Sequence, residues 1–462
     1  MVRKTSTLLI LILLAAGCTL IPEYRRPGAP VPEAWPSGPS YKDGPAAPLG
    51  AEVPWRAFFT DERLQAVIAA ALENNRELRS AALNVERARA FYRIQRAELL
   101  PAVDAVGSGS KARVPYDLSG TGRSETVEQY RAELGVASWE IDFFGRIRSL
   151  ERRALEEYLA TEQARRAAQI LLVSEVAYAY LVLAADREGL QLAQSTLEAQ
   201  QASYDLIRRR FEVGIVPALD LRQVQTRVDA ARVDVARYTE LVAKGENALT
   251  LLVGAAVPGA WLPEGLSAVA SLPDVSAGTG SEVLLSRPDV LQAEGLLKAA
   301  NADIGAARAA FFPRIALTAG VGTASEQLTG LFQSGSLAWS YTPVIVMPIF
   351  DARTWAALDA SEVQQRIALN QYEGAIQAAF REVADALARR GTMSEQLAAQ
   401  QSLVEATAET YRLSNARYEK GSDIYLNVLD AQRSLYSAQQ GLIAIRLVKL
   451  LNQVRLYAAL GG

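Results

Sequence analysis

Two aspartates and a leucine close behind a glycine are the residues of this chain best suited to chemistry. Asp423, Leu426 and Asp430 follow Gly421 at i, i+3 and i+7, which predicts one face of a helix. Carboxylates gathered in a narrow passage repel anions, attract cations and accept ion pairs or hydrogen bonds, and a leucine among them excludes water. The pattern therefore favours electrostatic selection and closure over bond making. A solvated helix face is the plainer alternative.

The composition removes most catalytic alternatives. The 462-residue chain has no histidine, which is the commonest general base and metal ligand. Its single cysteine, Cys18, can form neither an intrachain disulfide nor a zinc cluster. No glycine-rich phosphate loop is present, and the net charge of −3 does not indicate nucleic acid as a partner. We therefore expect no enzyme, no cofactor and no metal site.

The stretch that carries the aspartates is repeated in the first half of the chain. Arg417 and Gly421 repeat Arg210 and Gly214 at a constant offset of 207 residues. Each glycine follows a long alanine-rich run, where it can take positive φ and end a helix. Each stretch therefore predicts the turn of a helical hairpin, in a chain made of two duplicated halves.

The helices that must position these turns are predicted to be very long. The runs form two pairs, residues 146–212 with 217–253 and residues 352–420 with 424–458, and a shorter run covers 61–99. Gly374 and Gly391 are expected to interrupt the third long run. The first run would extend about 100 Å at 1.5 Å per residue. Helices of this length need neighbours along their whole length.

Four segments have strand character, namely residues 102–116, 126–142, 314–324 and 337–350. In the second, Tyr130, Ala132 and Leu134 alternate with polar residues, which is typical of a membrane β-strand. Two soluble β-hairpins packed on helices remain the alternative from alternation alone. Four aromatic residues fit either an aromatic girdle near one membrane interface or core packing where a barrel meets helices, namely Phe143, Phe144, Trp339 and Phe350.

The N-terminus predicts export and a lipid anchor. A basic start is followed by an apolar run too short to span a bilayer stably, which is typical of a secretion signal. Small residues precede Cys18 as in a bacterial lipobox, where that cysteine is lipidated; a plain signal peptide with an incidental cysteine is the alternative. Thr19 stands where an aspartate would imply inner-membrane retention, so the resemblance implies the outer membrane.

These segments predict a five-part organisation. We expect a lipoprotein signal peptide over 1–17, an acylated proline- and glycine-rich tether over 18–60, a first repeat over 61–253, a linker over 254–280 and a second repeat over 281–462. Each repeat would contain a helix, two β-strands and a long helical hairpin.

Four strands cannot close a barrel, and an open sheet edge cannot face lipid. Closed bacterial barrels begin at about eight strands. Three chains would supply twelve strands and six helical hairpins around one tube. We therefore expect an α+β membrane protein with a trimeric 12-stranded β-barrel, four strands coming from each chain.

On these features the chain resembles the TolC/OprM-type outer-membrane factors, in the NodT-like lipoprotein branch. The matching segments are the lipobox through Cys18, the duplicated halves, Phe143–Arg146, Arg417–Gly421, Leu429–Ser434 and Leu456–Gly462. The resemblance covers essentially the whole chain. It implies a barrel continuous with a long periplasmic α-helical barrel, in the outer membrane of a Gram-negative bacterium.

The resemblance also implies the function and the partners. A homotrimer of this kind would conduct, passively, substrates that an inner-membrane pump, expected to be of the RND type, exports through a periplasmic adaptor. A channel for type I protein secretion and a lipid-anchored periplasmic coiled-coil scaffold are the alternatives. Drugs, metals, solvents and secreted proteins all use channels with this pattern.

The resemblance assigns roles to the residues around the two turns. It places the periplasmic gate at Leu426 and Asp430, with Asp423 lining its outer side and with Arg417 and Tyr418 as latch partners. The adaptor would contact the hairpin tips, represented here by Gly214, Val216, Asp220, Gly421 and Ser422.

Overall fold

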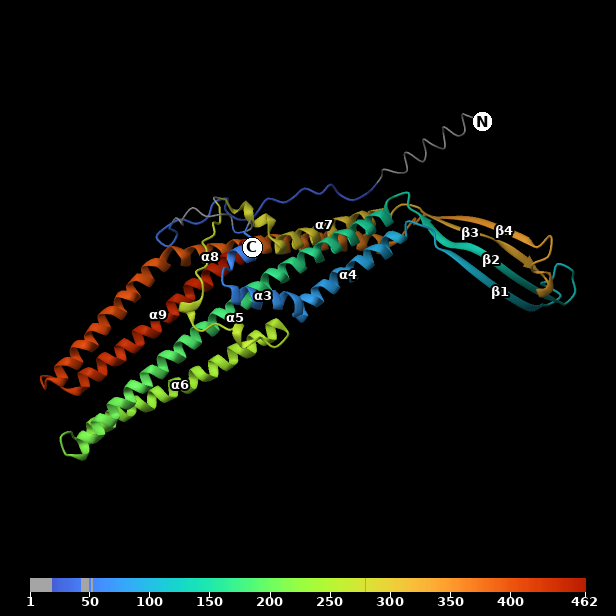
Figure 1. Cartoon of the computed structure of the whole chain (residues 1–462). Coiled ribbons are helices and arrows are strands. Elements are labelled where there is room, and N and C mark those ends of the chain that lie inside the picture. Colours follow the sequence, from blue (N-terminus) through green and yellow to red (C-terminus); the bar gives the residue numbers. More distant parts are fainter. Residues whose placement is uncertain (1–18, 43–49, 51–52, 279) are drawn as a thin grey trace. The chain divides into compact units, whose positions relative to one another are not determined.

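The computed structural model describes residues 19–42, 50, 53–278 and 280–462. The predicted signal peptide and the lipidation of Cys18 lie outside these residues. Each half of the chain supplies a helix, two strands and a long helical hairpin in the same order (Figure 1). The first half has α4 (Arg76–Ala97), β1 (Val103–Val114), β2 (Glu125–Ile141), α5 (Arg146–Glu212) and α6 (Ala218–Val253). The second half has α7 (Pro288–Ala309), β3 (Arg314–Ser325), β4 (Leu337–Val346), α8 (Ala352–Glu419) and α9 (Tyr425–Ala459).

Smaller elements surround these. Helices α2 (Trp55–Phe58) and α3 (Glu62–Asn74) precede the first half. The short 3-10 helices are η2 (Gly259–Trp261), η3 (Leu266–Ala268), η4 (Ser281–Ser286) and η5 (Leu328–Gly330). Two compact units result. One holds residues 1–28, 84–162 and 292–372, with all four strands, and the other holds 29–83, 163–291 and 373–462, with the hairpin arms.

The four strands form one antiparallel sheet in the order β1-β2-β3-β4 (Figure 1). Strands from the two halves meet at its centre, where Tyr130 of β2 pairs with Ser325 of β3. The register shifts between Val136 and Trp139, a bulge at which Ser138 takes a φ of 53°. Within the described residues, β1 and β4 each pair along one side only, so the sheet has two open edges.

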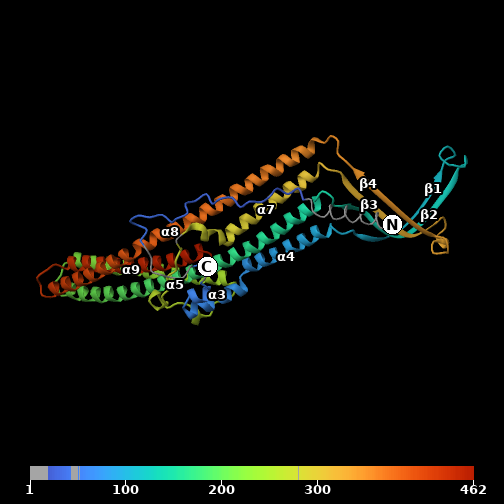
Figure 2. The ribbon, with the colours of Figure 1, turned by 90° about the horizontal axis from the view of Figure 1, so that it is seen from above.

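Both predicted hairpin turns are confirmed. Gly214 and Gly421 adopt φ of 76° and 72°, which glycine reaches without steric cost. After each glycine the chain turns back and caps the helix: the Ile215 amide donates to the Arg210 carbonyl at 2.8 Å, and the Ser422 amide donates to the Arg417 carbonyl at 3.0 Å. In Figures 1 and 2 the two turns lie at the same end of their unit.

The run predicted over 61–99 is wrong as one helix, because it breaks at Asn75 into α3 and α4. The Asn75 side chain explains the break. Its oxygen accepts from the Leu78 amide at 2.8 Å, which caps the start of α4, and its nitrogen donates to the Leu252 carbonyl at the end of α6, also at 2.8 Å. One buried amide thus satisfies two helix ends.

The predicted interruptions at Gly374 and Gly391 are also wrong, since α8 is continuous through both. Gly391 has a packing role instead: a Cβ there would collide with the carbonyl oxygen of Ser40, where the extended N-terminal segment crosses the helix. Nothing lies within 4 Å of a Cβ built at Gly374.

The same N-terminal segment packs against α7 within the sheet-bearing unit. A Cβ at Gly305 would lie 2.8 Å from the Ile21 nitrogen, so the glycine permits close approach. Glu294 is nearly buried there, and it accepts from Tyr24 at 3.1 Å and from the Arg26 Nε at 3.0 Å. A buried carboxylate needs such partners. The predicted tether is therefore bound along its path by specific contacts.

Replacing each helical glycine by alanine separates these two roles. Gly374→Ala should stabilise the protein by about 0.5–1 kcal/mol, because alanine is the better helix former. Gly391→Ala should destabilise it by about 1–3 kcal/mol, because the new Cβ forces Ser40 outward. Thermal unfolding measures both changes, and tryptic cleavage after Lys42 should accelerate only in Gly391→Ala. Equal behaviour of the two variants would contradict the packing role of Gly391.

Candidate functional site

The turn between α8 and α9 holds most of the predicted site residues. Helix α9 begins at Tyr425 with Ile424 as its N-cap residue. Leu426 and Asp430 are therefore on the helix, as expected, but Asp423 precedes it. The prediction that all three residues share one helix face is wrong for Asp423, because the chain needs Gly421 to Ile424 to reverse direction before helical geometry starts.

The Asp423 side chain makes its contacts within the turn instead. Its Oδ1 accepts from the Asn427 amide group at 2.6 Å and from the Ile424 backbone amide at 2.8 Å. Its Oδ2 lies 3.4 Å from the Arg417 Nε, and only 18% of the Asp423 side chain is exposed. These contacts fix the start of α9 and tie the end of α8 to it. Arg417 thus engages its own hairpin.

Leu426 and Asp430 face outward one turn apart on α9. Leu426 is 48% exposed, and the Asp430 side chain is 61% exposed. Asp430 pairs with Arg433 at 2.8 Å, an exposed i,i+3 ion pair of the kind that contributes at most about 1 kcal/mol. Sequence reasoning missed Arg433, although an arginine three residues after an aspartate on a helix was a usable signal.

The opposite side of the same turn is buried between the two hairpins. Ile207 of α5, Val224 of α6 and Tyr425, Val428 and Leu429 of α9 form this inter-hairpin cluster. Val216 and Tyr418 pack against its edge, and the rings of Tyr418 and Tyr425 are 4.8 Å apart. Burial raises the pKa of Tyr425. Within two helical turns, α9 therefore presents an apolar anchor on one side and an exposed leucine and aspartate on the other.

One polar contact joins the hairpins at the level of the cluster. Arg210 of α5 donates a hydrogen bond from Nη1 to the Tyr418 hydroxyl at 2.9 Å, and its guanidinium lies 5.7 Å from the centre of that ring. Tyr418 was a predicted latch residue, but its partner Arg210 was missed. The duplicated turn motif contained Arg210, yet nothing in the sequence indicated which residue of the other hairpin it would meet.

A further side-chain contact joins α9 to α6 beyond the turn. The Tyr436 hydroxyl donates to the Asp234 Oδ2 at 3.1 Å, and Asp234 also pairs with Arg237 at 2.9 Å. Burial and the neighbouring Asp234 carboxylate raise the pKa of Tyr436. Because Asp234 and Tyr436 are about 200 residues apart in sequence, no local pattern predicted this pair.

The first hairpin tip exposes three large apolar side chains. Val213 and Ile215 flank Gly214 and are each 70% exposed, and Leu219 is 65% exposed. Val216 turns inward to the cluster, so it is only partly available on the surface. Asp220 lies in the first turn of α6, and Gly421 and Ser422 are exposed on the second tip. Among the described residues, no group of three acidic side chains could hold a metal ion.

The chain matches a known family over most of its length. The family model for outer membrane efflux proteins matches residues 67–255 and 279–462. The chain is 50% identical over 465 residues to the toluene efflux pump outer membrane protein TtgC of Pseudomonas putida, covering 100% of this chain and 96% of that protein. Identity and coverage are the same for the antibiotic efflux pump outer membrane protein ArpC of Pseudomonas putida.

Solved structures share the fold as well. A membrane protein from Pseudomonas aeruginosa gives a TM-score of 0.91 at 40% identity, covering 96% of this chain and 98% of that one. The open state of the MtrE outer membrane channel from Neisseria gonorrhoeae gives a TM-score of 0.87 at 37% identity, with coverage of 96% and 98%. The fold is thus shared with outer membrane channels.

Neighbouring residues of α9 test the division between anchor and exposed face. Tyr425→Ala should loosen the hairpin tips and cost about 3–5 kcal/mol, because it empties the inter-hairpin cluster. Leu426→Ala should change stability by less than about 1 kcal/mol, because nearly half of that side chain is already exposed. Thermal unfolding and tryptic cleavage after Lys420 report both effects. Comparable losses in both variants would mean that Leu426 is also packed.

Proposed function

The chain belongs to the outer membrane efflux protein family, and from this membership we propose that three copies form one passive channel with a gate at the hairpin tips. The protein is an outer membrane channel of an efflux pump, as the sequence resemblance implied. The observation that carries the proposed gate is the exposure of Leu426 and Asp430 beside the buried cluster that holds their helix in place.

The open edges of the sheet support the trimer. Backbone groups on β1 and β4 lack partners within one chain, and each unsatisfied group in hydrocarbon costs several kcal/mol. Pairing β4 of one copy with β1 of the next satisfies both edges. Three copies supply twelve strands, which exceeds the roughly eight needed for a closed membrane barrel.

The gate follows from three-fold repetition of α9. Leu426 and Asp430 would form two rings one helical turn apart, an apolar constriction next to a ring of carboxylates. Asp430 has only an exposed pairing with Arg433, so it keeps most of its negative field. The ring would attract cations and repel anions. Asp423 is too deeply engaged in the turn to line the passage, and we assign it to positioning α9.

The latch consists of contacts that opening must break. If the two hairpins separate, the Arg210 to Tyr418 hydrogen bond is lost, whereas the Arg417 to Asp423 pair moves with its own hairpin. We therefore assign the latch to Tyr418 with Arg210, and assign Arg417 to the rigidity of the second tip. Opening by relative movement of the hairpins also requires the Tyr436 to Asp234 bond to yield.

Removing the carboxylate ring should widen and neutralise the mouth. Asp430→Ala should raise single-channel conductance in planar bilayers severalfold, because the smaller side chain widens the constriction. It should also reduce selectivity for cations, because a ring of three charges disappears. Asp229→Ala is the matched control, since Asp229 forms an equally exposed i,i+3 pair with Arg232 on α6. Conductance and selectivity that change equally in both variants would remove Asp430 from the gate.

The hairpin tips would also receive the periplasmic adaptor, which links the channel to an inner-membrane pump expected to be of the RND type. Val213, Ile215 and Leu219 leave an apolar surface at the first tip, where a partner could bury them. The relatives named for toluene and antibiotics support small, largely apolar molecules as the cargo. We further assign the lipid anchor to Cys18.

Polar substitution at the first tip tests the adaptor surface. Ile215→Ser combined with Leu219→Ser should lower crosslinking to the adaptor and sensitise cells to the exported compounds, because the apolar contact area is lost. Leu328→Ser is the control, because Leu328 is just as exposed but lies in the loop between β3 and β4. Conductance of the double variant should stay unchanged. Full efflux by the double variant would place the adaptor contact elsewhere.

A further inference from the structure

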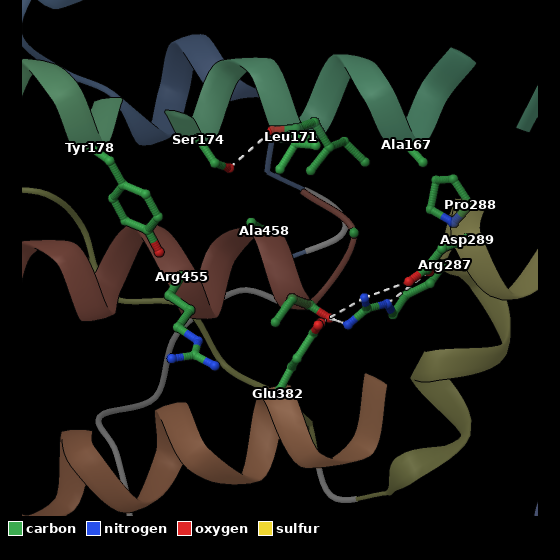
Figure 3. A pocket seen from close by; sticks show the side chains of 13 residues that line it. Ala167, Leu171, Ser174, Tyr178, Arg287, Pro288, Asp289, Glu382, Arg455 and Ala458 are labelled. Carbon is green, nitrogen blue, oxygen red and sulfur yellow. Dashed lines mark hydrogen bonds and ion pairs between the residues drawn. The ribbon is translucent and has the colours of Figure 1, made fainter. Parts of the chain in front are cut away.

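A cavity of about 340 Å³ lies among α5, α8, α9 and the start of α7, away from the hairpin tips (Figure 3). All its walls belong to one compact unit. The apolar walls are Ala167, Ile170 and Leu171 from α5, Pro288 from α7 and Ala458 from α9. This volume falls at the lower end of the range for small-molecule pockets, which suits a ligand with one or two rings.

The buried arginine of this cavity already uses four of its five N–H donors, and two carboxylates balance its charge. Arg287 is 7% exposed and donates to both oxygens of Asp289, at 3.0 and 2.7 Å. It also donates to Glu382 at 2.9 Å and to the Ala459 carbonyl at 2.7 Å. Figure 3 shows these bonds converging on its guanidinium. Arg287 therefore joins three helices, and it is not available to a ligand.

The other end of the cavity has positive charge without a partner. Arg455 of α9 lines it beside Tyr178 of α5 (Figure 3). Burial raises the pKa of Tyr178, and the positive charge of Arg455 opposes that shift. Within the described residues, no ion pair or side-chain hydrogen bond holds Arg455.

We propose that this cavity binds small carboxylates with an apolar body. The apolar part would lie against Ile170, Leu171 and Pro288, and the carboxylate would reach Arg455 and the Tyr178 hydroxyl. An unpaired guanidinium group beside a phenol forms a donor set for a carboxylate. At the far end, Glu382 and Asp289 share one arginine and would repel a second anionic group, which fixes the orientation of the ligand.

Such a ligand would contact both hairpin arms, since α5 belongs to the first and α8 and α9 to the second. Occupancy would therefore stabilise their arrangement and raise the unfolding temperature of the protein. The proposal does not depend on the gate at the hairpin tips, and it concerns a solute site on the helical part of the channel protein.

Calorimetric titration of the full-length protein in detergent tests the site with 2-naphthoate as the probe. We expect saturable binding of one molecule per chain, with the neutral analogue 2-naphthalenemethanol binding at least about tenfold more weakly, because it lacks the charge-assisted hydrogen bonds. Arg455→Gln should weaken binding of 2-naphthoate by about tenfold or more. Arg366→Gln, an exposed arginine of α8 outside the cavity, should leave affinity unchanged.

A filled cavity provides a second test that leaves Arg455 in place. Ala167→Phe should abolish binding of 2-naphthoate and its effect on the unfolding temperature, while the variant stays folded. Binding that is equal for acid and alcohol, unaffected by Arg455→Gln relative to Arg366→Gln, or absent altogether would overturn the proposal. Because these readouts measure no conductance, failure here is distinguishable from failure of the proposed gate.

Discussion

The unpaired backbone along the edges of the β-sheet is the constraint on which the rest of the molecule depends. In water an edge strand can hydrogen-bond to solvent, but in hydrocarbon it cannot. In the part of the chain that the structure describes, the first and last strands of the sheet each lack a neighbour on one side. A sheet that spans a membrane must therefore find its missing partners in other copies, and three-fold repetition of every side chain follows from that need.

Three-fold repetition of the chain makes one face of α9 important. In a single chain, Leu426 and Asp430 are ordinary exposed residues, and the ion pair between Asp430 and Arg433 is weak. Their orientation is fixed because Tyr425, Val428 and Leu429, on the same two turns, are buried against the other hairpin. The apolar side of α9 determines the orientation of its polar side. In the proposed gate, the geometry of the mouth would therefore depend on packing that does not itself line the passage.

The sequence predicted what depends on local periodicity, and it failed where distant segments meet. The long helices and both glycine turns followed from alanine-rich runs and from the need for positive φ at Gly214 and Gly421. The break at Asn75 was missed, because its reason is partly a carbonyl of Leu252 far along the chain. Gly391 was predicted to interrupt a helix, because no local sequence pattern shows that the segment at Ser40 crosses α8 at this residue. The sequence likewise indicated Tyr418 as a latch residue, but it did not indicate that Arg210 of the other hairpin would bond to it.

The close contact between Ile21 and Gly305 has a consequence for the depth of the bilayer. Only three peptide units separate Ile21 from Cys18, and an extended chain covers about 3.5 Å per residue. A lipid on Cys18 could thus enter the membrane no farther than about 10 Å from the point where Ile21 meets α7. The acyl chains would then hold the inner surface of the outer membrane near Gly305.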